Sequence, residues 1–167
     1  MASQLGKIVV GGGSGFIGSA ITSKLQKKGY DVVVVSRKPG AWRITWEELC
    51  TSGLPSTCVA VVNVAGQNVL DPMRRWTPGF KQNVWASRVE TTRYLAEAIR
   101  KTAVKPKVFV SMSGVGYYPP GTGAEFDEAS AGGDFDFLSR LCADWEAAAR
   151  LPDVPDVRTV SVRTAIN

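Results

Sequence analysis

Three glycines near the start of the chain have the spacing of a phosphate-binding turn. Gly12, Gly15 and Gly18 form the pattern G-x-x-G-x-x-G directly after the apolar run Ile8–Val10. In such a turn the first glycine lets the backbone reverse, the second lets it approach a pyrophosphate, and the third lets helix and strand pack closely. The anion then binds free N–H groups at the positive end of the following helix. An ordinary flexible turn can contain the same glycines, so the surrounding elements decide.

Those surrounding elements have the order strand, helix, strand. Helical spacing predicts a helix over 15–28, with an apolar face made of Phe16, Ile17, Ala20, Ile21 and Leu25. The apolar run at 31–35 then predicts an interior parallel strand that is covered on both faces. Together these pieces form a βαβ unit, and this context favours a dinucleotide site.

The residues after the second strand distinguish the two nicotinamide dinucleotides. An NAD site has a carboxylate here for the ribose 2′-hydroxyl, whereas an NADP site has a cation for the 2′-phosphate. The chain has Ser36 and Arg37 and no acid at this point. A guanidinium binds phosphate through a planar pair of donors, and a serine adds a hydroxyl. We therefore predict NADP(H) as the cofactor; the alternative is a solvated basic turn.

The rest of the chain continues the alternation of strands and helices. We predict strands over 42–46, 58–66, 107–113 and 157–163, and helices over 47–54, 80–102 and 135–150. This order predicts an α/β fold with a doubly wound parallel sheet, in which ligands bind at the carboxyl ends of the strands. Ser113 ends one such strand, so its hydroxyl is a candidate for chemistry. Arg88 falls among the packing residues of the longest helix and needs an anionic partner or a route to solvent.

Composition limits the possible functions. The 167 residues, 44% of them hydrophobic, suit one globular domain over 1–167, and the dispersed net charge of +5 does not favour nucleic-acid binding. Histidine is absent, which essentially excludes a Ser-His-Asp triad, and we expect no metal site. We expect neither a membrane span nor a targeting peptide. The three scattered cysteines (Cys50, Cys58 and Cys142) suggest the cytoplasm or another reducing compartment.

Seven motifs follow one another along nearly all of the chain: GGGSGFIG, VVSRKPG, VVNVAG, SR-x-x-TT, SMSGVGYY, GGDFDF and ADWEAAAR. In this order they resemble the extended short-chain dehydrogenase/reductases, and most of all the atypical epimerase family branch, whose members are nucleoside-diphosphate-sugar epimerase-like. The resemblance implies an NAD(P)-binding Rossmann fold and chemistry at a carbonyl or alcohol carbon of an unknown small molecule. It assigns to the pyrophosphate Gly12, Gly15, Phe16, Ile17 and Gly18; to the 2′-phosphate Ser36 and Arg37; to the adenosine Val64 and Ala65; and to positions near the cofactor Asn83 and Arg88.

The resemblance is incomplete at the residues for proton transfer. Typical members have a serine and a Tyr-x-x-x-Lys pair, in which the tyrosine exchanges a proton with the substrate oxygen and the lysine assists it. Ser113 matches the serine, but Leu138 and Cys142 stand at the Tyr and Lys positions. Tyr118 stays a candidate phenol, with no cation evident beside it, whereas we expect Tyr117 to pack. The chain is thus either an oxidoreductase or epimerase-like enzyme, or a non-catalytic NADP(H)-binding sensor or scaffold.

Extended members of this superfamily continue well beyond the Arg163-Thr164 motif into a substrate-binding part. This sequence ends at Asn167, so we expect a C-terminally truncated chain that keeps the cofactor half and lacks most of the substrate part. Such a chain would leave one edge of its sheet uncovered. We therefore expect marginal stability or self-association through that edge.

Overall fold

A computed structural model describes residues 5–121 and 123–165, so both ends of the predicted domain, 1–167, lie outside the described residues. Within them, six parallel strands form one sheet in the order β3-β2-β1-β4-β5-β6. The strands are β1 (Lys7–Gly11), β2 (Asp31–Ser36), β3 (Arg43–Thr45), β4 (Cys58–Asn63), β5 (Val108–Gly114) and β6 (Arg158–Thr164). The predicted doubly wound parallel sheet is confirmed. Its strand order reverses direction at β1, and sheets of this kind bind ligands at such a switch point.

Every helix that the sequence predicts is present, with slightly different ends. The helices are α1 (Phe16–Lys27), α2 (Trp46–Ser52), α3 (Pro78–Lys101) and α4 (Phe137–Ala149), and a 3-10 turn, η1 (Val115–Tyr117), follows β5. Side-chain caps set three of the starts. Thr45, Thr77 and Asp136 each accept the backbone N–H of the residue three positions later, which satisfies a donor that the helix leaves unpaired.

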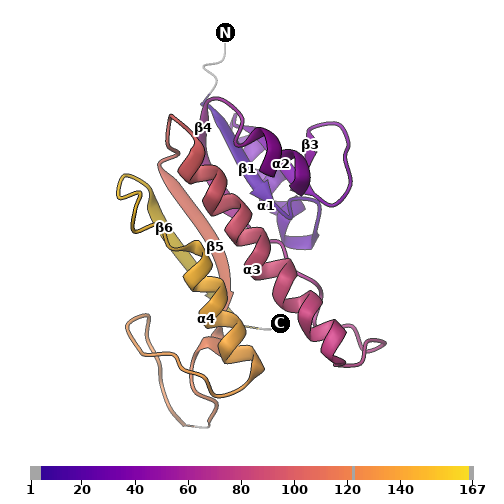
Figure 1. Cartoon of the computed structure of the whole chain (residues 1–167), viewed down its shortest axis with the longest axis vertical. Helices are drawn as coiled ribbons and strands as arrows, with labels where there is room; N and C mark the ends of the chain where they lie inside the picture. The colour runs from indigo at the N-terminus through magenta and orange to yellow at the C-terminus, as the bar shows by residue number, and fades with distance from the viewer. Residues whose placement is uncertain (1–4, 122, 166–167) are drawn as a thin grey trace.

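The helices cover the two faces of the sheet unequally. Figure 1 shows α2, α3 and α4 in front of the sheet, where Val9 and Phe109 of the strands form a core with Leu95 of α3. Neighbouring strand residues point to opposite faces. On the other face Ile8 therefore belongs to a separate core cluster, against which Leu25 of α1 packs.

The predicted apolar face of α1 is wrong for the first turn of that helix. Phe16 is 95% exposed and Ile17 is 49% exposed, whereas Leu25 in the last turn is half-buried. The reason is position: β1 ends at Gly11, so the first turn of α1 lies beyond the carboxyl end of that strand. The side chains of Phe16 and Ile17 therefore contribute little to the core. What this turn offers is its backbone N–H groups, which have no partner within the helix.

The outer strands of the described sheet are β3 and β6. Five of the seven residues of β6 are exposed, among them Val162 at 38%. Within the described residues β6 has a neighbouring strand on one side only, and self-association through this strand stays a prediction. No helix among the described residues is both long and apolar enough to cross a membrane.

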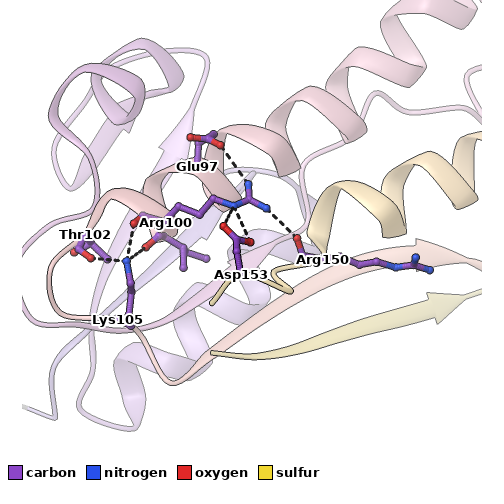
Figure 2. A network of polar contacts seen from close by, with 7 residues as sticks. Glu97, Arg100, Thr102, Lys105, Arg150 and Asp153 are labelled. Atoms are coloured by element: carbon purple, nitrogen blue, oxygen red, sulfur yellow. Dashed lines mark hydrogen bonds and ion pairs between the residues drawn. The ribbon is translucent and has the colours of Figure 1, made fainter. Parts of the chain in front are cut away.

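A polar network holds the carboxyl end of α3 (Figure 2). Lys105 Nζ donates to the carbonyl oxygens of Ile99, Arg100 and Thr102 at 3.0, 2.6 and 2.7 Å. These are carbonyls that the end of a helix leaves without intrahelical partners. The Arg100 guanidinium donates to Asp153 at 2.9 Å, and this hydrogen bond lowers the pKa of the Asp153 carboxyl below its ordinary value.

Replacing Lys105 with methionine should destabilise the fold without affecting ligand binding. The substitution keeps an apolar stem and leaves three carbonyls without their donor, so we expect the free energy of unfolding to fall by roughly 1–3 kcal/mol. Urea denaturation of Lys105→Met and of the wild type measures this change. The network lies at the amino ends of the strands, away from the carboxyl-end site, so the affinity for NADPH should stay the same. Unchanged stability would show that water replaces the ammonium at no cost.

Candidate cofactor-binding site

The glycine turn after β1 has no room for side chains at its first and third glycines. Gly12 has φ +73°, and a β-carbon there would lie 2.6 Å from the Ala65 Cα. A β-carbon on Gly18 would overlap the Gly12 carbonyl oxygen and would lie 2.6 Å from the Gly13 Cα. These two positions therefore require glycine because backbone packs directly against backbone.

The second glycine leaves the start of α1 open. Gly15 is the cap residue of α1, and a β-carbon there would approach the Gly12 carbonyl oxygen no closer than 3.4 Å. No acid stands in the first turn of α1 and no side chain caps it. Helix geometry leaves the N–H groups of Phe16, Ile17 and Gly18 without intrahelical acceptors. Together these donors form a cluster at the positive end of the helix that suits a pyrophosphate.

The turn after β2 places Ser36 and Arg37 differently. Ser36 is buried and its Oγ donates to the Lys38 carbonyl oxygen at 2.7 Å, so its hydroxyl proton already shapes the turn. Arg37 is exposed, and among the described residues it forms no ion pair with a carboxylate. Because β2 runs parallel to its neighbour β1, Arg37 follows the carboxyl end of its strand just as the glycine turn follows the carboxyl end of β1. Of the two residues, Arg37 is the one free to bind an incoming phosphate.

Val64 and Ala65 pack against Gly12 and form one wall of the glycine turn. A buried polar network that was not predicted from the sequence holds this wall in place. Asn63, at the end of β4, is fully buried, and its Oδ1 accepts the Ala65 N–H at 3.1 Å. Its Nδ2 donates to Thr92 Oγ1 at 2.9 Å, and Thr92 Oγ1 also accepts the Trp145 Nε1 proton at 3.1 Å. Val64 is fixed as well, since its N–H donates to the Gly11 carbonyl oxygen at 2.9 Å. The sequence feature that could have revealed this network is Asn63 itself, a polar amide side chain at the end of an otherwise apolar strand.

Arg88 of α3 lies against this wall. Its Cζ would be 3.0 Å from a β-carbon on Gly66, and its guanidinium donates to the carbonyl oxygens of Val84 and Gln67 at 3.2 and 3.0 Å. Among the described residues it forms no ion pair, and it lies 5.4 Å from the Trp145 ring. Burial lowers the pKa of Arg88 below its ordinary value. Of the two options that the sequence leaves for Arg88, an anionic partner or a route to solvent, the described residues supply no carboxylate, and backbone carbonyls hold the guanidinium instead.

Asn83 lies elsewhere on α3 and is exposed. The carbonyls that contact Arg88 come from the loop after β4 and from the preceding helical turn. The structure thus places Ala65 against Gly12 and Arg88 beside Gly66, and it leaves Asn83 on the surface.

Beyond this wall, a second polar network joins the carboxyl ends of β5 and β6. Ser113 Oγ donates to Glu146 Oε1 at 2.8 Å, and Ser113 is 2% exposed. Arg163 binds the same carboxylate through two nitrogens, at 2.7 and 2.9 Å, and its Nη1 donates to the Tyr118 hydroxyl at 2.9 Å. The two predicted catalytic residues, Ser113 and Tyr118, are therefore linked through Glu146 and Arg163. Neither linking residue was identified from the sequence as part of a site.

Comparison with known proteins identifies the family to which these elements belong. A model of the NAD dependent epimerase/dehydratase family matches residues 8–143. The chain belongs to this family. Epimerase family protein SDR39U1 of Homo sapiens is 54% identical over 160 residues, which are 96% of this chain and 54% of the relative. The Bacillus subtilis epimerase family protein YfhF is 32% identical over 168 residues, 95% of this chain and 54% of its own length. The chain therefore spans about half the length of these epimerase family relatives.

Solved structures of the epimerase family agree with this assignment. The crystal structure of human epimerase family protein SDR39U1 with NADPH superposes with a TM-score of 0.90 at 55% identity, over 94% of this chain and 52% of that one. A nucleoside-diphosphate sugar epimerase from Corynebacterium glutamicum superposes with a TM-score of 0.74 at 28% identity, over 96% of this chain and 34% of that one. The predicted membership of the epimerase family branch is confirmed.

This epimerase family chain fills the expected proton-transfer positions of α4 with packing residues. A β-carbon on Gly116 of η1 would lie 3.3 Å from the Leu138 Cβ, so η1 rests directly on Leu138. Cys142 is buried, and burial raises the pKa of its thiol above the ordinary value. Within the described residues no cluster of three or more His, Cys, Asp and Glu could hold a metal ion. Any proton transfer by this chain must therefore use residues other than those of α4 at these positions.

Proposed function

We propose that this chain is the NADP(H)-binding domain of an oxidoreductase or epimerase-like enzyme that acts on a carbonyl or alcohol carbon. The observation that carries the proposal is that the glycine turn and Arg37 follow the carboxyl ends of two neighbouring parallel strands. A pyrophosphate would bind the amides of Phe16, Ile17 and Gly18, and the 2′-phosphate would bind Arg37. The human relative with 55% identity, crystallised with NADPH, supports the same cofactor.

The residues present suit this dinucleotide in two further respects. The backbone of Val64 and Ala65 is fixed by Asn63 and Gly11, so it offers a preformed wall for the adenosine side. Arg88 adds a partly buried cation whose partners are carbonyls, and a nearby phosphate would give it a full counter-charge. When bound, the reduced nicotinamide supplies a hydride to a carbonyl carbon. The protein must supply the matching proton.

A second candidate is a sensor or scaffold that binds NADP(H) without turnover. The observation that favours it is the replacement of the Tyr and Lys positions by the packed Leu138 and the buried Cys142. The two candidates differ in one property: only the enzyme moves a hydride between the bound nicotinamide and a substrate carbon. An oxidoreductase shows this as net oxidation of NADPH when a carbonyl compound is added, whereas an epimerase-like enzyme returns the hydride to its substrate. Both predict the same cofactor, so binding alone tests what they share.

The decisive binding experiment compares NADPH with NADH. We expect the wild type to prefer NADPH, and Arg37→Glu to lose that preference, because the substitution removes a charged hydrogen-bond donor and adds a repelling carboxylate. One such bond is worth roughly 1.5–3 kcal/mol, or roughly 10- to 150-fold in affinity. Titration with nicotinamide fluorescence as the signal measures both constants.

Arg158→Glu is the matched control for this titration. Arg158 is exposed at the amino end of β6, so its reversal makes the same change in net charge away from the site. We expect Arg158→Glu to bind both dinucleotides as the wild type does. Equal affinity of the wild type for NADPH and NADH would refute the assignment of the 2′-phosphate to Arg37.

A further inference from the structure

We propose that Tyr118 transfers the proton to the substrate oxygen and that Arg163 is the cation that positions it, in place of the Tyr and Lys of α4. This inference rests on the proposed enzymatic function. It also gives Ser113 a supporting role rather than a direct one.

Tyr118 and Arg163 lie at the carboxyl ends of the strands, where parallel sheets of this kind bind ligands. Tyr118 directly follows η1, which itself begins where β5 ends. Arg163 is the next-to-last residue of β6 and pairs in register with Ser113 of β5. Both therefore stand at carboxyl ends of parallel strands, on the side of the sheet that carries the glycine turn. Tyr118 is only half-buried, so part of this residue faces solvent.

The Arg163 guanidinium is rigidly held and permanently charged. Glu146 accepts from Nε at 2.7 Å and from Nη2 at 2.9 Å, and these hydrogen bonds raise the pKa of Arg163 above its ordinary value. The remaining terminal nitrogen donates to the Tyr118 hydroxyl at 2.9 Å. A donor fixed beside the phenol oxygen stabilises the negative charge that develops there when the proton leaves. Arg163 itself cannot accept that proton, so its role is positioning and charge stabilisation.

The Tyr118 proton already points at a carbonyl. The hydroxyl donates to the Asp127 carbonyl oxygen at 2.9 Å, and the Tyr118 ring stacks on Phe126 with centroids 5.1 Å apart. A substrate carbonyl that takes the place of this backbone carbonyl would receive the same proton. As the carbonyl carbon gains the hydride that NADPH would supply, leaving NADP⁺, the electron pair of the C=O π bond moves to oxygen, which takes the Tyr118 proton. The O–H bond of Tyr118 breaks, an alcohol forms, and the phenolate regains a proton from water.

Ser113 is less suited to touch a substrate. It is 2% exposed, and its hydroxyl proton is committed to the Glu146 carboxylate at 2.8 Å. In this arrangement Ser113 helps to hold Glu146, which in turn holds Arg163. The epimerase-family pattern would make Ser113 the more sensitive residue; the geometry points to Tyr118 instead.

Oxidation of NADPH in the presence of 4-nitrobenzaldehyde, an activated carbonyl probe, tests this assignment. We expect Tyr118→Phe to lower kcat by about 100-fold or more, the usual contribution of a general acid. Ser113→Ala should lower it by less than about tenfold, because that residue acts through two others. Arg163→Lys should keep more activity than Arg163→Met, since the ammonium preserves a charged donor. Tyr94→Phe, an exposed tyrosine on α3, is the matched control and should match the wild type.

A second measurement does not depend on turnover. Labelling with an aryl sulfonyl fluoride, read by mass spectrometry, should modify Tyr118, and NADPH should slow the modification by more than about threefold if the phenol faces the cofactor edge. Labelling of Tyr94 should not respond to NADPH. Wild type that binds NADPH yet oxidises it with none of the carbonyl compounds added would refute the carbonyl-reducing function and this inference with it. Turnover that survives Tyr118→Phe, or Tyr118 labelling that ignores NADPH, would overturn the inference alone.

Discussion

Replacing Gly18 with alanine should both destabilise the protein and abolish NADPH binding. The new β-carbon would overlap the Gly12 carbonyl oxygen, and both partners are backbone, so α1 must move away from β1. Forced overpacking of this kind costs roughly 1–3 kcal/mol of folding free energy. The movement also displaces the amides that bind the pyrophosphate, each worth roughly 1.5–3 kcal/mol to a charged ligand. Thermal unfolding and NADPH fluorescence titration measure the two effects.

Substitutions of two other glycines separate the effect on folding stability from the effect on NADPH affinity. Gly79 of α3 has open space around its missing β-carbon, so Gly79→Ala should leave the affinity unchanged and should not lower the stability. Gly15→Ala should cost much less stability than Gly18→Ala, because its β-carbon meets only the Gly12 carbonyl oxygen at 3.4 Å and the remaining cost is that of alanine at the N-cap of α1. It should still weaken NADPH binding, since that β-carbon occupies the space of the pyrophosphate. A Gly18→Ala protein that binds NADPH normally would place the cofactor elsewhere.

The parts of the candidate site whose local geometry follows from the sequence are those that lie within a short stretch of backbone, and the ligand contacts of these residues stay predictions. The glycine turn is readable because a strand, three spaced glycines and a helix start determine one local geometry. Gly12 and Gly18 indeed have no room for a side chain, and α1 begins beside them. The place of Arg37 is predictable for a similar reason, because it directly follows a recognisable buried strand, whereas its binding to a phosphate stays a prediction.

The parts that the sequence does not predict depend on partners far apart along the chain. Glu146 and Arg163 lie 17 positions apart on different elements, and their pairing with Ser113 arises only when β5, β6 and α4 pack. The sequence showed no cation beside Tyr118, whereas the fold brings Arg163 to it across 45 positions. Phe16 is an error of a different kind, since the sequence predicts it on the buried face of α1 and the structure leaves it exposed. Helical periodicity does not reveal that the strands of the sheet end before this turn.

Replacing Glu146 with leucine should be among the most destabilising single changes in this chain. Glu146 is 8% exposed at its side chain and forms the ion pair with Arg163, which is itself 17% exposed. The substitution leaves a largely buried guanidinium without its carboxylate and also removes the acceptor of the Ser113 hydroxyl. Breaking one partner out of a buried pair costs roughly 3–5 kcal/mol. Urea denaturation of Glu146→Leu against the wild type measures the loss.

The double variant Glu146→Leu with Arg163→Met then separates the two roles of the pair. Removing both charges leaves no uncompensated ion, and apolar replacement of buried ion pairs is often neutral or stabilising by about 1–4 kcal/mol. We therefore expect the double variant to recover most of the stability that Glu146→Leu loses. It still lacks the donor beside the Tyr118 hydroxyl, so NADPH oxidation should stay low although NADPH binds normally. Recovery of stability and turnover together would show that the pair serves the fold alone, because Tyr118 would then work without a neighbouring cation.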